Sequence, residues 1–159
     1  MYQYFPSKDA LISALFEREA EDQRQAFVAM AAELGTDDAP RLIRALVDWS
    51  VRHLEKKKEL NRVLLEEVPR VSGLEQSRAI DHVAANSVRL LLEVGKARVQ
   101  ARDLDVAALL VVRAFRYTII PLLQEPVSGA QREAFVDELT DLIAAYLLAP
   151  RSWRGGEGS

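Results

Sequence analysis

The sequence predicts an all-α protein, a single bundle of about six helices. Residues that favour helices, above all Ala, Leu, Glu and Arg, make up much of the chain, which has only 7 glycines. Apolar residues recur at helical spacing through most of its length. No segment carries the alternating pattern of a strand or the turn signal of a hairpin, so helices must supply the whole core.

Length, charge and cysteine usage exclude several classes of protein. A chain of 159 residues can bury one hydrophobic core, so one domain is expected. The lack of cysteine removes disulfides and thiolate chemistry and fits a reducing cytosol. A formal net charge of −3 argues against a domain that coats nucleic acid through bulk charge. With no signal peptide and no expected membrane span, we predict a soluble cytoplasmic protein.

Caps and helix-stopping residues predict where the helices begin and end. The first helix starts at Ser7, whose hydroxyl can cap free N–H groups, and stops at Gly35. Pro69 ends the third helix, and residues 70–73 after it are expected to form a loop. The expected helices span roughly residues 7–34, 38–58, 59–68, 74–99, 105–123 and 130–148, followed by a disordered tail over 151–159.

The expected fourth and fifth helices differ in how much of their surface is apolar. The fifth is apolar on nearly every side between Val106 and Leu123 and is interrupted mainly by Arg113 and Arg116. Such a helix must be covered by more than one neighbouring layer. The fourth is amphipathic, with its core face expected at Ile80, Val83, Ala84, Ser87, Leu91 and Val94.

The charged and polar residues give no catalytic or metal-binding pattern. The two histidines lack the spacing of a helical metal site, and no nucleophile has a base partner, so neither an enzyme nor a cofactor is expected. The acidic residues around Glu19 are expected on a solvated helix face. The run of Lys56, Lys57 and Lys58 is expected to offset a helix dipole.

The first eleven residues carry the most specific motif in the chain. Tyr2, Tyr4 and Phe5 are followed by Ser7, Lys8 and Leu11. Tyrosine hydroxyls and a lysine ammonium near a helix start suit phosphate oxygens, although the aromatic residues could also be a staple before a capped helix. This segment resembles the end of the recognition helix in TetR-family transcriptional regulators, and the order of helices after it resembles that family over the remaining residues.

The resemblance implies a domain order and roles for the first residues. Residues 1–6 would be the remnant of the recognition helix, and residues 7–150 the helical effector-binding and dimerisation domain. Tyr2, Tyr4 and Lys8 would contact the DNA backbone in the intact protein. The helices that precede this motif in the family are absent from the sequence. The chain is therefore a fragment, begins at a wrongly assigned start, or has lost its DNA reader, and it should not read bases by itself.

A ligand pocket is expected between the second and fourth helices. Leu42, Leu46, Trp49 and His53 share one face, and a few polar groups on an apolar wall would orient a small apolar or amphipathic effector. The alternative for His53 is a histidine packed beside a core tryptophan. The residues predicted to bind the ligand are Trp49, His53, Val83, Asn86, Phe115 and Tyr117.

The last two helices are expected to form a two-fold dimer. Two apolar helices from each of two subunits would make a four-helix bundle that buries both faces. The residues assigned to this interface are Leu109, Ile119, Leu139, Leu142, Ile143 and Tyr146.

Together these features predict the effector-binding and dimerisation portion of a TetR-like repressor. Ligand binding would change the separation of two DNA-reading heads in the intact protein, which binds operator DNA only with the missing helices. The alternative is a helical dimerisation protein that does not bind DNA and sequesters a full-length relative. The sequence does not identify the effector, the operator or the regulated genes.

Overall fold

The computed structural model describes residues 4, 6–34, 38–95, 97–101 and 103–149, with the backbone alone described for residues 16, 61, 63–77 and 79–80. These residues form helices and connecting turns, with no strand among them, so the predicted all-α class is confirmed. The described helices are α1 (Lys8–Leu34), α2 (Ala39–Lys56), α3 (Lys58–Val94), α4 (Leu104–Gln124) and α5 (Gly129–Leu148).

Short polar residues cap four of the helices at or beside the positions that the sequence indicates. Ser7 Oγ accepts a hydrogen bond from the Ala10 N–H at 3.1 Å, and Asp38 Oδ1 accepts one from the Arg41 N–H at 3.1 Å. Asp103 and Ser128 cap α4 and α5 in the same way. Each cap satisfies an N–H that has no partner inside the helix, so these starts are decided locally.

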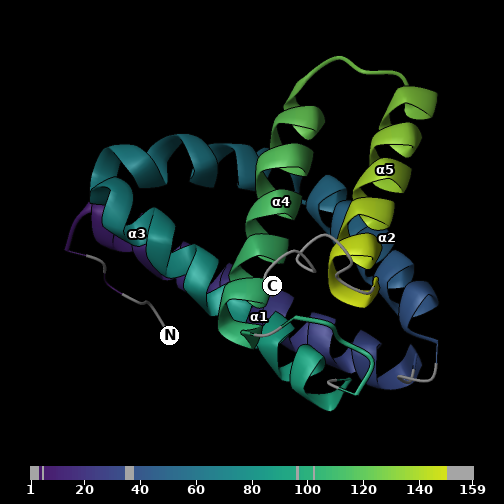
Figure 1. The fold of residues 1–159 in the computed structure, drawn as a ribbon. Helices are drawn as coiled ribbons and strands as arrows, with labels where there is room; N and C mark the ends of the chain where they lie inside the picture. The colour runs from purple at the N-terminus through teal and green to yellow at the C-terminus, as the bar shows by residue number, and fades with distance from the viewer. Residues whose placement is uncertain (1–3, 5, 35–37, 96, 102, 150–159) are drawn as a thin grey trace, which may run out of the picture.

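The expected break after Pro69 is wrong, because α3 is one continuous helix from Lys58 to Val94. Proline removes one helical hydrogen bond but can bend a helix without ending it. Figure 1 shows that α3 is bent: its first, darker part runs outward from the end of α2, and its second part turns back towards α1 and α4. The two helices expected at 59–68 and 74–99 are thus the two arms of α3, and the second arm ends earlier than expected.

Helix α4 forms the centre of the fold. It packs against α3 on one side and α5 on the other, while α2 packs on α1 and α5 (Figure 1). Ala107, Ala108 and Ile119 of α4 are completely buried. This helix is also long and apolar enough to cross a membrane by length and composition, contrary to the expectation that no segment approaches a span. Six of its residues are buried, and they belong to the hydrophobic core of the bundle.

The buried face of α3 is rotated from the one that the sequence pattern indicates. Val83 and Val94, expected in the core, are 47% and 69% exposed. Among its described side chains, the buried ones are Asp81, Ala85, Ser87 and Leu92, and of these only Ser87 was expected. The reason is that α3 contacts α4 along this stripe, and the carboxylate of Asp81 finds cationic partners on α4 that make its burial possible.

Candidate functional site

A cavity of about 320 Å³ lies inside the bundle and is lined by residues from all five described helices. Its wall is mostly aliphatic and includes the aromatic side chains of Phe27, Trp49 and Phe115. The polar residues on the wall are Glu19, Gln23, Arg24, Ser50, Ser87, Arg98 and Arg116. A largely apolar cavity with a few polar groups is the usual form of a site for a small organic ligand.

The aromatic side of the cavity is built by α1 and α2. The ring centroids of Phe27 and Trp49 lie 5.9 Å apart with the planes tilted by 59°. The His53 ring also stacks on Trp49, with centroids 5.1 Å apart and planes 25° apart. His53 is not among the lining residues, and it contacts Trp49 as residues four positions apart on one helix do.

A polar cluster joins α1 to α2 beside this aromatic wall. Lys57 Nζ donates to Glu19 Oε1 at 2.6 Å and to Oε2 at 2.8 Å. His53 Nε2 lies 3.6 Å from Glu19 Oε1, which is too long for a hydrogen bond, and it is buried without a hydrogen-bond partner among the described residues. Burial, and next the charge of Lys57, lowers the pKa of His53. The imidazole is therefore held in its neutral form near neutral pH.

Glu19 corrects the expectation of a solvated acidic face on α1. Its side chain is only 14% exposed and it lines the cavity. The neighbouring Glu21 does lie on the surface, where hydrogen bonds from Arg24 and then Gln25 lower its pKa to about 2. Lys57, expected to offset a helix dipole, instead holds Glu19. The partner of Glu19 is 38 residues away, so no local pattern could have found this pair.

The structure brings only some of the predicted ligand-binding residues to the cavity. Trp49, Val83 and Phe115 line it. Asn86 is exposed and Tyr117 is 64% exposed, and neither lines the cavity. Their neighbours Ser87 and Arg116 line the cavity instead, and adjacent positions of a helix point about 100° apart. A role in ligand binding stays a prediction for the three lining residues.

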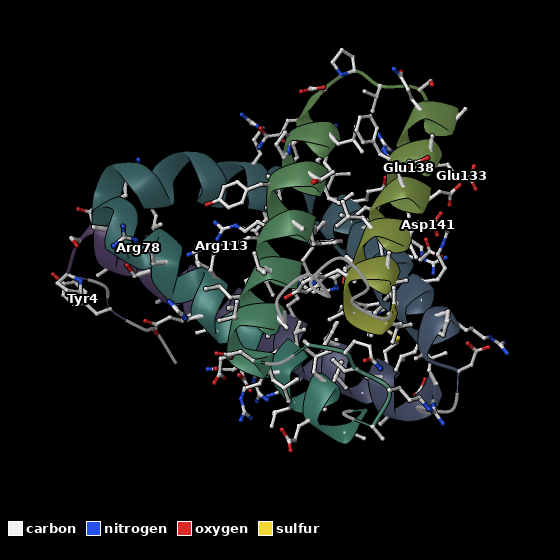
Figure 2. The ribbon with its side chains drawn as sticks, viewed as in Figure 1. Tyr4, Arg78, Arg113, Glu133, Glu138 and Asp141 are labelled. Atoms are coloured by element: carbon white, nitrogen blue, oxygen red, sulfur yellow. The ribbon has the colours of Figure 1, made fainter. Side chains whose placement is uncertain are left out.

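A second polar cluster joins α3 to α4 and was not predicted. Asp81 is only 2% exposed and accepts hydrogen bonds from Arg113 Nε at 3.1 Å and Arg116 Nη1 at 2.5 Å. Figure 2 shows Arg113 reaching from α4 towards α3. The available signal was the pair of arginines one turn apart in an otherwise apolar helix, since such charges require an acidic partner when they are buried.

The residues assigned to the dimer interface divide into core and surface. Ile119, Leu139 and Ile143 are at most 5% exposed within the single chain, so they belong to its core and have no surface left for a second copy. Leu109 and Tyr146 are partly buried against the core. Leu142 is 58% exposed. The large exposed apolar residues of α4 and α5 are Val106, Leu110, Tyr117, Phe135 and Leu142.

The residues assigned to the DNA backbone lie at the start of α1. Tyr4 is 89% exposed and lies far from α4 and α5 in Figure 2. Lys8 is the first residue of α1 and is exposed, whereas Tyr2 lies outside the described residues, as does the predicted tail. Within the described part of the chain, no group of three or more His, Cys, Asp or Glu could hold a metal ion.

The chain was compared with models of known protein families. The family described as "Tetracyclin repressor-like, C-terminal domain" matches residues 38–147, which includes α2 to α4 and most of α5. No curated protein and no solved structure matches. Domains of this family generally dimerise and bind small effectors.

Proposed function

We propose that this chain is the effector-binding and dimerisation part of a cytoplasmic transcriptional repressor. The chain belongs to the family of tetracyclin repressor-like C-terminal domains. The observation that carries the proposal is the partly open apolar cavity of about 320 Å³, which residues of all five described helices line. No catalytic group accompanies this cavity among the described residues, and its wall suits binding better than chemistry.

The effector would act through α1. This helix contributes Glu19 and Phe27 to the cavity wall, and it begins directly after the segment that resembles the end of a DNA-reading helix. Glu19 is paired with Lys57, the residue directly after α2, so α1 is linked to the end of α2 beside the cavity. A ligand that fits better when α1 is displaced would shift its position, and a tilt of α1 would move a DNA-reading head attached to it.

Dimerisation is supported by the exposed apolar side chains of α4 and α5. In one chain, Leu110, Phe135 and Leu142 leave 49%, 45% and 58% of their surfaces in contact with water. A second copy related by a two-fold axis would cover both helices, and an obligate interface of this kind buries on the order of 2,000 Å². Glu133, Glu138 and Asp141 lie on the side of α5 away from α4 (Figure 2). We expect these acidic residues to lie at the polar rim of the interface.

The dimer is tested by sedimentation equilibrium at micromolar concentration. A species of twice 17.8 kDa is expected, and Leu142→Glu should convert it to a monomer. Leu90→Glu is the matched control, because Leu90 is 59% exposed on α3 and its replacement should leave the dimer intact. A monomeric parent protein, or equal dissociation by both variants, would contradict the proposed surface.

The repressor role is tested by the codons upstream of Met1. If they encode a helix-turn-helix, the longer product should retain a two-fold symmetric operator in a gel shift and release it when an effector fills the cavity. If they do not, the repressor assignment fails for this chain. The alternative of a dimerisation protein that captures a full-length relative is then favoured, and mixing the two should yield heterodimers without DNA affinity.

A further inference from the structure

Among the described residues, three buried side chains are polar or charged: Asp81, Ser87 and Thr140, each at most 6% exposed. Asp81 accepts hydrogen bonds from two arginines of α4, and the Thr140 hydroxyl donates to the Val136 carbonyl at 2.7 Å. No residue in the described part of the chain forms a hydrogen bond with the Ser87 hydroxyl. Buried side-chain polar groups normally have a partner, so this exception requires an explanation.

Ser87 lies on the wall of the cavity. The other residues that α3 contributes to this wall are all apolar, and they are Val83, Ala84, Val88, Leu91 and Leu92. A serine in a helix can donate to the carbonyl four positions earlier, as Thr140 does, but Ser87 makes no such bond with Val83. The Ser87 hydroxyl is therefore available as a donor to a molecule in the cavity.

We propose that the cavity binds a largely apolar carbonyl compound, whose oxygen accepts a hydrogen bond from Ser87 while its apolar part packs against Trp49 and Phe115. This inference rests on the proposed effector-binding function and names its ligand class. A carbonyl oxygen only accepts hydrogen bonds, so one hydroxyl donor satisfies it, whereas a ligand hydroxyl would bring a donor of its own. Without that donor, a carbonyl beside the aliphatic wall of α3 would lose its hydrogen bonds to water uncompensated.

The first measurement determines whether the Ser87 hydroxyl has a structural role. Ser87→Ala removes one oxygen atom and favours the helix, because Ala has the highest helix propensity. Since no described residue bonds to this oxygen, the Tm of Ser87→Ala, followed by circular dichroism, should equal or exceed that of the parent protein. A Tm lower by more than about 4 °C would show that the hydroxyl stabilises the fold, and the inference would be overturned.

The second measurement compares two probes of the same shape by isothermal titration calorimetry. They are methyl pentyl ketone and its alkene analogue, in which a methylene group replaces the ketone oxygen. Ser87→Ala should weaken binding of the ketone about ten-fold and leave binding of the alkene unchanged, because only the ketone loses a hydrogen bond.

Ser50→Ala is the matched control, because Ser50 lines the same cavity from α2 and is only partly buried. This variant should bind both probes as the parent protein does.

The outcomes separate this inference from the proposed function. If neither probe binds the parent protein, effector binding itself fails. If only the alkene binds, or if Ser87→Ala weakens both probes equally or not at all, the cavity binds apolar molecules without selecting a carbonyl at Ser87, and the inference is overturned. A loss of ketone binding in Ser50→Ala in place of Ser87→Ala would overturn it as well.

Discussion

Replacement of Asp81 by Asn tests the buried ion cluster that joins α3 to α4. Asn has nearly the same shape, so the change removes the negative charge and leaves Arg116, whose side chain is 16% exposed, without it. Breaking a buried pair from one side costs about 3–5 kcal/mol. Arg113 is 44% exposed and is largely solvated in either case, so the lower end of that range applies.

We therefore expect Asp81→Asn to lower the free energy of unfolding by about 3 kcal/mol, equivalent to a fall in Tm of about 6–12 °C for a chain of this size. The assay is urea and thermal unfolding followed by circular dichroism at one protein concentration, because dimer stability depends on concentration. Glu21→Gln is the control, since the Glu21–Arg24 pair is on the surface and its loss should leave the unfolding midpoint unchanged.

A double variant separates lost charge pairing from lost packing. Asp81→Leu together with Arg116→Met replaces the buried charges by apolar groups of similar size, which is often neutral or stabilising for a buried pair. The double variant should be more stable than Asp81→Asn. The reasoning is refuted if Asp81→Asn costs less than about 1 kcal/mol, or if the double variant is the less stable of the two.

Three further predictions concern the pH dependence of stability, the hydrophobic core and DNA binding. In the folded protein, burial and the charges of Lys57 and Lys56 lower the pKa of His53, and Glu19 opposes this effect. The unfolded chain therefore binds a proton at this histidine more readily than the folded protein does. The free energy of unfolding should therefore fall as the pH drops from about 7.5 through 6.5 to the pKa of His53 in the folded protein. His53→Gln should lose this part of the pH dependence when the two proteins are compared by urea unfolding. The same pH dependence in both proteins would contradict the prediction. Ile119→Ala should cost about 2–5 kcal/mol because the side chain is fully buried, whereas Val106→Ala, at 51% exposure, should cost far less in the same assay. The 159-residue chain should give no sequence-selective gel shift, because its formal net charge is −3 and a complete helix-turn-helix is needed to reach base edges. Retention of DNA that is selective and tolerant of salt would contradict this prediction.

Much of the candidate site could be anticipated only in outline. Trp49 and Phe115 were identified because large aromatic residues at helical spacing in an amphipathic bundle face inward. Asn86 and Tyr117 were not placed correctly, since a rotation of one residue in a helix turns a side chain by about 100°, enough to move it from the cavity to solvent. The pattern on α3 indicated a core face with Val83 and Val94, whereas the packed helix buries Asp81.

The sequence by itself determined the class of the fold and the starts of four helices. Ser7, Asp38, Asp103 and Ser128 bond to backbone N–H groups within three residues, so the information for each cap is local. The tertiary structure decided which charges are buried. Glu19 meets Lys57 across 38 residues and Asp81 meets Arg116 across 35, and only the packed helices bring these partners together. A buried charge is tolerated only beside its counter-charge, so its position depends on contacts that no local pattern contains.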